Sequence, residues 1–160
     1  MPESPFEALL ADVRQIDGFV LGCLIDASTG MVLGSVQDHE DMRLPVAAAS
    51  ASDVANSISL MTGGLAANGA LEDVIITLSG HYHLIRQFSP TPRLQFLLLV
   101  VLDRARANLA MALRQVRDFD MKIVAAPDSG LPERRPREAA PGPDRKHRVP
   151  SQGSDIGSAW

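Results

Sequence analysis

The sequence has few of the residues on which catalysis, metal binding or covalent cross-linking depends. Its single cysteine, Cys23, lies in an apolar run, so neither an intrachain disulfide nor a multi-cysteine zinc site can form. Aromatic residues are only 4% of the 160 residues. No apolar run approaches the roughly 20 residues that cross a bilayer, and the N-terminus lacks the basic and apolar regions of a secretory signal. These absences predict a cytoplasmic protein without membrane insertion.

Negative charge predominates in the larger part of the chain. Residues 1–126 carry nine Lys and Arg against fourteen Asp and Glu, whereas the last 34 residues carry six against five. An acidic domain is a poor match for a phosphate backbone, so we expect no nucleic-acid binding. Six of the eleven prolines follow Ala126, together with Arg134, Arg135 and Arg137. This composition predicts a domain over residues 1–126 and a disordered Pro/Arg-rich tail over residues 127–160.

Apolar periodicity and turn residues predict the order of the elements within the domain. A helix over residues 5–16 is followed by strands over 19–25 and 31–36, joined by an Asp-Ala-Ser-Thr-Gly turn. A long helix begins at Pro45, and strands follow over 71–78, 81–88 and 94–102. Pro90 is expected to interrupt the last pair, the strand over 94–102 to lie centrally, and Asp103 to be the N-cap of a final helix.

The long helix over residues 44–67 is apolar on more than one face. At about 100° per residue, one stripe is assigned to the sheet: Ala47, Ala51, Val54, Ala55, Ile58, Met61 and Leu65. A second set lies elsewhere: Val46, Ala49, Leu60, Gly64 and Ala67. Gly63 and Gly64 each cost roughly 1 kcal/mol relative to Ala in a helix interior. The second set can arise simply because alanine has a high helix propensity, without any contact on that side. The glycine pair instead favours close contact with a second subunit.

No constellation for chemistry stands out. His81 and His83 share a strand face, but no third ligand accompanies them, so a solvated pair is preferred to a metal site. Cys23 has no basic neighbour and is interpreted as a buried, inert thiol. The glycines match neither a dinucleotide fingerprint nor a phosphate loop. The sequence therefore predicts no cofactor, no metal and no enzymatic activity.

The order of the elements, with its local sequence, resembles the Roadblock (dynein light chain) family over residues 3–121. The resemblance lies in Ile16-Asp17-Gly18 before the first strand, Ile25-Asp26 and residues 30–33 around the hairpin, the Ala-rich helix, Val74-Ile75-Ile76, and Leu98-Leu99-Val100-Val101. It implies an α+β fold, α-β-β-α-β-β-β-α. A five-stranded, mainly antiparallel sheet would carry the long helix on one face and the two terminal helices on the other.

The same resemblance implies a dimerisation module that has no chemistry of its own. In the family two long helices pack side by side and the third strands of two sheets pair, so residues 71–78 would form an edge strand. The residues expected at an interface with a second copy or a partner are Val46, Ala49, Leu60, Gly64, Ala67, Leu71, Val74, Ile75, Ile76 and Leu78. An unpaired edge this apolar would otherwise favour aggregation.

Three functions follow as hypotheses. Bacterial members of the family act with small Ras-like GTPases, which implies a homodimeric regulator or scaffold for such a GTPase. A second hypothesis is a small-molecule sensor with a pocket between helix and sheet, lined by Met31, Tyr82 and Phe96, although few aromatics and an Ala-rich helix favour a filled core. A third is a structural scaffold without a GTPase partner.

Overall fold

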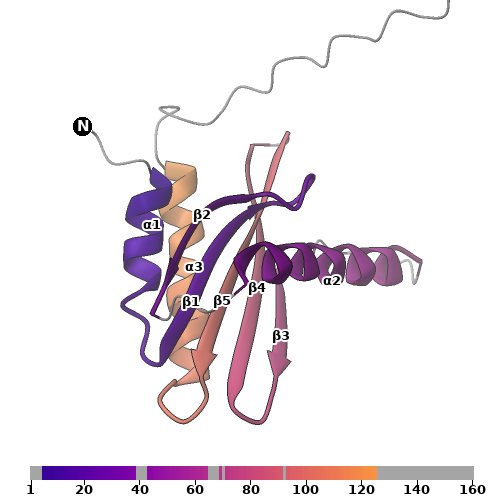
Figure 1. The fold of residues 1–160 in the computed structure, drawn as a ribbon. Coiled ribbons are helices and arrows are strands. Elements are labelled where there is room, and N and C mark those ends of the chain that lie inside the picture. Colours follow the sequence, from indigo (N-terminus) through magenta and orange to yellow (C-terminus); the bar gives the residue numbers. More distant parts are fainter. Residues whose placement is uncertain (1–4, 39–42, 65–68, 70, 92, 126–160) are drawn as a thin grey trace, which may run out of the picture.

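The computed structural model describes residues 5–38, 43–64, 69, 71–91 and 93–125 (Figure 1). The helices are α1 (Pro5–Val13), α2 (Leu44–Gly64) and α3 (Leu109–Ala125). The strands are β1 (Phe19–Asp26), β2 (Val32–Gln37), β3 (Asp73–Thr77), β4 (His81–Thr91) and β5 (Leu94–Asp103). This order confirms the predicted one. The predicted tail over residues 127–160, together with Leu65 and Ala67, lies outside the described residues.

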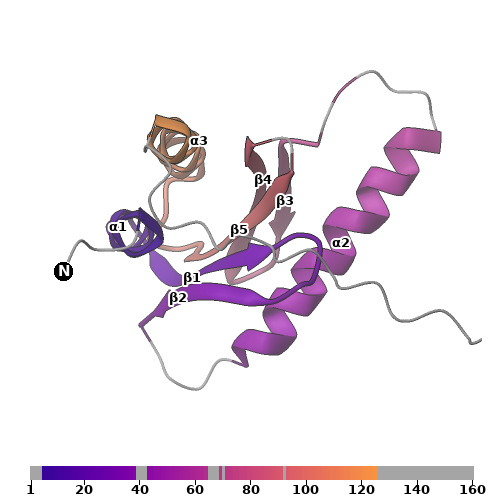
Figure 2. The same cartoon turned by 90° about the horizontal axis from the view of Figure 1, so that it is seen from above.

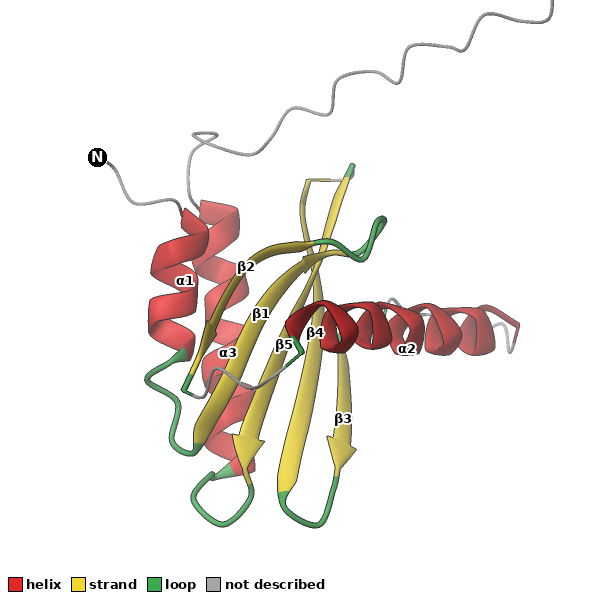
Figure 3. Cartoon of the chain, viewed as in Figure 1, coloured by secondary structure: helices red, strands yellow, loops and turns green. Residues whose placement is uncertain are grey.

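The five strands form one sheet in the order β2-β1-β5-β4-β3, and each neighbouring pair is antiparallel (Figure 3). The most apolar strand, β5, lies at the centre as predicted, because its side chains are buried on both faces. Among the described strands β3 has a neighbour on one side only, which confirms that it is an edge strand of this sheet. β2 forms the other edge.

The helices cover the two faces of the sheet unequally. α1 and α3 lie together on one face and α2 lies alone on the other, as Figure 2 shows from above. The first face holds the aromatic cluster with Phe6, Phe88, Phe96 and Phe119. The second face holds aliphatic strand residues beneath the small side chains of α2. The arrangement is the predicted α+β fold.

Two boundary predictions are corrected. Asp103 does not cap the final helix: its carboxylate accepts the Ala105 N–H at 2.9 Å in the turn after β5. α3 begins six residues later, where the Asn108 side-chain oxygen accepts the Met111 N–H at 3.2 Å. Pro90 does not end its strand either, because β4 runs on to Thr91. The register shift between Phe88 and Thr91 accommodates the proline, as a bulge can.

α2 meets the sheet only along its first half. Its buried residues are Ala48, Ala51, Ser52 and Ala55. Past these positions the helix continues beyond β3, and no strand among the described residues lies beneath it (Figure 1). The prediction that Met61 faces the sheet is therefore wrong within one chain, since its side chain is 58% exposed. The helical period was correct, but the sheet ends before the apolar stripe does.

Candidate functional site

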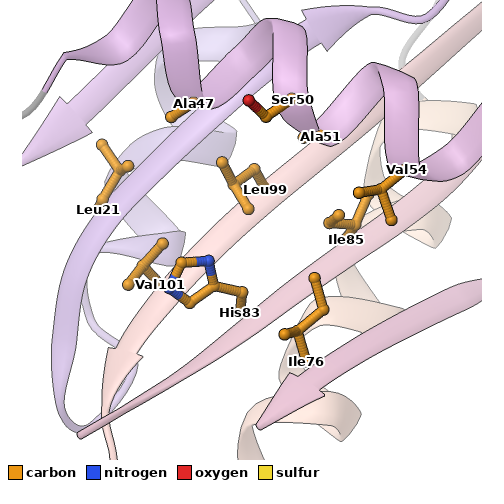
Figure 4. A pocket seen from close by; sticks show the side chains of 10 residues that line it. All are labelled: Leu21, Ala47, Ser50, Ala51, Val54, Ile76, His83, Ile85, Leu99 and Val101. Carbon is orange, nitrogen blue, oxygen red and sulfur yellow. The ribbon is translucent and has the colours of Figure 1, made fainter. Parts of the chain in front are cut away.

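A groove of about 180 Å³ lies between α2 and the sheet (Figure 4). It is lined by Leu21, Ala47, Ser50, Ala51, Val54, Ile76, His83, Ile85, Leu99 and Val101. Protein interiors rarely leave voids larger than a water molecule. A groove of this size in a mostly apolar wall therefore marks a place where packing within one chain is incomplete.

The floor of the groove is a row of four side chains that runs straight across the sheet. Leu21 of β1 is opposite Val101 of β5, Val101 is opposite His83 of β4, and His83 is opposite Ile76 of β3. Residues in register share a face, so these four form a continuous line at right angles to the strands. We call Leu21, Val101, His83 and Ile76 the floor row. Its direction suits an element that crosses the strands as α2 does.

One side of α2 forms the wall of the groove. Ala47, Ser50, Ala51 and Val54 follow one another at helical spacing along this side, and Figure 4 shows them above the strand residues. Their side chains are small, so they leave a gap between α2 and the floor row. The groove is open because α2 carries no large residue there.

The free edge of β3 lies next to the groove. The Leu78 N–H donates to the His81 carbonyl at 2.9 Å, and the Gln87 N–H donates to the Glu72 carbonyl at 2.9 Å. In an antiparallel pair the bonded positions alternate. The backbone groups of Val74 and Ile76 therefore point toward β4, and those of Asp73, Ile75 and Thr77 point outward. This edge can accept another strand.

The structure distributes the predicted interface residues over two surfaces. Val46 and Leu60, respectively 58% and 79% exposed, lie with Ala49 and Gly64 on the exposed side of α2. Leu71, Val74 and Ile76 are partly buried on the α2 face of the sheet. The side chains of Ile75 and Leu78, 44% and 45% exposed, lie at the β3 edge. The role of these residues at an interface stays a prediction, and the groove between the two surfaces was not predicted from the sequence.

His83 is the polar member of the floor row. Its side chain is half-buried, so the prediction of a solvated histidine pair is corrected for this residue. Desolvation, followed by repulsion from the nearby His81, lowers the pKa of His83 from its ordinary value of 6.5. Ile76 of β3 and Val101 of β5 lie opposite His83, and α2 adds Ala47, Ser50, Ala51 and Val54 to the same groove; none of these residues titrates. The uncharged imidazole is therefore the form that this surface favours.

We expect the stability of the fold to fall as the pH is lowered through 6.5. The unfolded chain binds a proton at His83 more readily than the folded chain, so stability rises with pH between the lowered folded pKa and 6.5, and is complete above 6.5. Urea denaturation from pH 5 to 8 would measure it. The His83→Gln variant should show a weaker pH dependence of stability. An unchanged pH dependence in this variant would show that other groups cause it.

Cys23 lies on β1 in the aliphatic cluster under α2 and is fully buried. Burial raises the pKa of its thiol to about 11, which keeps the sulfur protonated near neutral pH. The predicted burial of the thiol is thereby confirmed. Among the residues that the structure describes, no group of three or more His, Cys, Asp or Glu is arranged for a metal ion. No helix in the same ranges is long and apolar enough to cross a membrane.

The pocket expected for a sensor domain does not have the predicted lining. Phe96 and Tyr82 belong to the aromatic cluster on the α1 and α3 face, opposite the groove. Met31, 65% exposed, lies just before β2. The expectation of a fully filled core under α2 is also wrong, because the groove is there. Its lining is aliphatic except for His83 and Ser50.

Solved structures share this fold. MglB of Myxococcus xanthus superposes with a TM-score of 0.67 at 9% identity, over 78% of this chain and 95% of that one. An MglB with a tetrameric arrangement gives 0.64 at 15% identity, over 78% and 90%. A Roadblock/LC7 domain from Streptomyces avermitilis gives 0.59 at 16% identity, over 72% and 92%. Neither models of protein families nor curated protein sequences match the chain. The fold is Roadblock-like, as the sequence predicted.

Proposed function

We propose that the chain is a non-enzymatic, cytoplasmic homodimer that regulates or scaffolds a small Ras-like GTPase. The observation that carries the proposal is the pair of incomplete surfaces on a Roadblock-like fold, the free β3 edge and the half of α2 that extends beyond it. Both surfaces lack a partner within the described part of the chain. A second copy would cover both at once, since a two-fold axis beside β3 joins the two edges and brings each α2 over the other sheet. The tetrameric arrangement of an MglB structure supports assembly of this fold.

The exposed side of α2 is the surface we propose for the GTPase. Leu60 with Gly64 and Val46 with Ala49 point away from the sheet, and the exposed Asp53 lies between them. Two copies sharing one sheet would leave these side chains uncovered. Apolar side chains that gather on one exposed face, in contrast to single ones, mark a site for a partner protein. In the Roadblock family, bacterial members act with Ras-like GTPases, which supports this class of partner.

Light scattering at micromolar concentration tests the assembly. We expect a particle of about twice 17.2 kDa. A monomer would contradict the dimer.

Binding of a Ras-like GTPase encoded beside this chain, loaded with GDP or with a non-hydrolysable GTP analogue, tests the partner. Leu60→Lys should weaken that binding about tenfold or more, because it places a charge at the anchor. A dimer that binds no GTPase in either state would favour the structural scaffold.

The groove favours one alternative, a small-molecule sensor. Apolar clefts with a few polar groups are typical of ligand sites. The floor row of this groove, however, crosses four strands from β1 to the edge strand β3, in the direction of α2. That shape fits a helix better than a compact ligand.

A further inference from the structure

The apolar stripe of α2 does not end where its own sheet ends. Ala47, Ala51 and Val54 line the groove, and the stripe continues at helical spacing with Ile58 and Met61. Ile58 is half-buried, whereas Met61 is 58% exposed. Within the described part of the chain, Met61 thus remains largely uncovered.

The geometry of the helix and sheet locates the point where α2 leaves its own sheet. α2 rises about 1.5 Å per residue, and neighbouring strands are about 4.8 Å apart, so roughly three residues pass each strand. Figure 4 places Ala47 near Leu21 of β1, Ala51 near Leu99 of β5 and Val54 near Ile85 of β4. By the same interval α2 passes β3 near position 57. Ile58 and the residues after it therefore lie beyond the edge.

We propose that Met61 of one copy fills the groove of the other, next to His83, in a reciprocal exchange. The inference rests on the proposed homodimer. With the β3 edges paired, the two-fold axis passes near position 59 of α2, about half a strand spacing beyond β3. Each α2 then runs antiparallel beside its mate, and Met61 of one copy lies above Ile76 in the floor row of the other.

A second copy fits the groove better than an unrelated protein because one stripe supplies both halves of the contact. Its first half is a wall of small residues that leaves the groove open, and its second half carries a long side chain that needs a groove. Such self-complementarity is the requirement for a two-fold interface. Methionine suits the role, since its flexible thioether fills irregular apolar gaps. The neutral His83 beside it is compatible with an apolar neighbour.

A pair of adjacent substitutions tests the inference. Met61→Lys and Leu60→Lys place the same charge one residue apart on an exposed helical segment, and both should leave the monomer folded by circular dichroism. In sedimentation equilibrium of the full chain, Met61→Lys should raise the dimer dissociation constant about 100-fold, because a lysine would be buried in the groove. Leu60→Lys should change it less than about threefold, since surface charges contribute little.

Disulfide trapping provides a second measurement. In a Cys23→Ala background, Met61→Cys combined with Ile76→Cys should give a cross-linked dimer on mild oxidation, and either cysteine alone should give far less. A wild-type dimer in which Met61→Lys has no effect and no cross-link forms would overturn the inference and leave the proposed dimer standing. A monomeric wild type would instead remove the dimer itself. A monomer that carries an apolar small molecule in mass spectrometry would overturn both in favour of a ligand site.

Discussion

Replacing Asp73 with alanine is expected to lower the free energy of unfolding by about 3 kcal/mol. Asp73 is the first residue of β3, and its side chain is only 13% exposed. Its Oδ1 accepts from the Arg86 Nη1 at 2.7 Å, and its Oδ2 accepts from the Arg117 Nη2 at 3.1 Å. The alanine variant takes a charged partner away from Arg86, which is also 13% exposed. Equilibrium urea denaturation of the two proteins measures the difference.

The matched control is Arg117→Ala, which breaks the other half of the same cluster. The Arg117 side chain is 58% exposed, so water replaces its partner and the loss should stay below about 1 kcal/mol. The double variant Asp73→Leu, Arg86→Leu should recover part of the stability, because two apolar side chains leave no buried charge. Equal losses of stability from Asp73→Ala and Arg117→Ala would show that the buried Asp73–Arg86 pair contributes no more to the free energy of unfolding than the exposed Arg117 contact.

The Asp73 cluster matters for function because it fixes the edge strand. Arg86 lies opposite Asp73 on β4, and Arg117 reaches it from α3. The three side chains thus join β3 to the sheet and to the helix on the face opposite the groove. An edge strand held in this way presents its outward backbone groups in a fixed register. Loss of the cluster is therefore expected to weaken assembly as well as folding.

The order of the elements could be predicted because it depends on local patterns. The unbroken apolar run of residues 96–102 identified a central strand, and Gly30 after Asp26 identified the first hairpin turn. The groove could not be predicted in the same way. Its floor row takes one residue from each of four strands, and the alignment depends on register shifts at Phe19/Leu21 between β1 and β5 and at Phe88/Thr91 between β4 and β5. No local pattern specifies those shifts.

The assignment of Met61 illustrates a second limit. Periodicity correctly placed Met61 on the same stripe as Val54, but it does not state how far the sheet extends beneath a helix. The width of the sheet is a property of the whole fold. Likewise, alternation along β4 placed His81 and His83 on one face, yet only the position of α2 decides that His83 lies in the groove. The most informative departures from prediction thus fall on the proposed interface.

Proline at position 75 is expected to abolish pairing of the β3 edges while the monomer stays folded. The Ile75 N–H points away from β4, so the substitution removes no bond within the described sheet. A proline on the outward side of an edge strand is tolerated by its own sheet, but it removes a donor and places its ring where a second strand would lie. We expect the dimer dissociation constant to rise about 100-fold or more, measured by sedimentation equilibrium, with the far-ultraviolet circular dichroism unchanged.

Ser35→Pro, on the opposite edge of the sheet, is the matched control for Ile75→Pro. The Asp38 N–H donates to the Val20 carbonyl, so by the same alternation the Ser35 N–H also points outward, from β2. The two substitutions are equivalent in backbone chemistry and differ only in which edge they block. If the copies join through β3, Ser35→Pro remains a dimer and Ile75→Pro does not. Loss of the dimer in Ser35→Pro alone would place the junction at β2, where neither Met61 nor the groove could take part, and would overturn the proposed assembly.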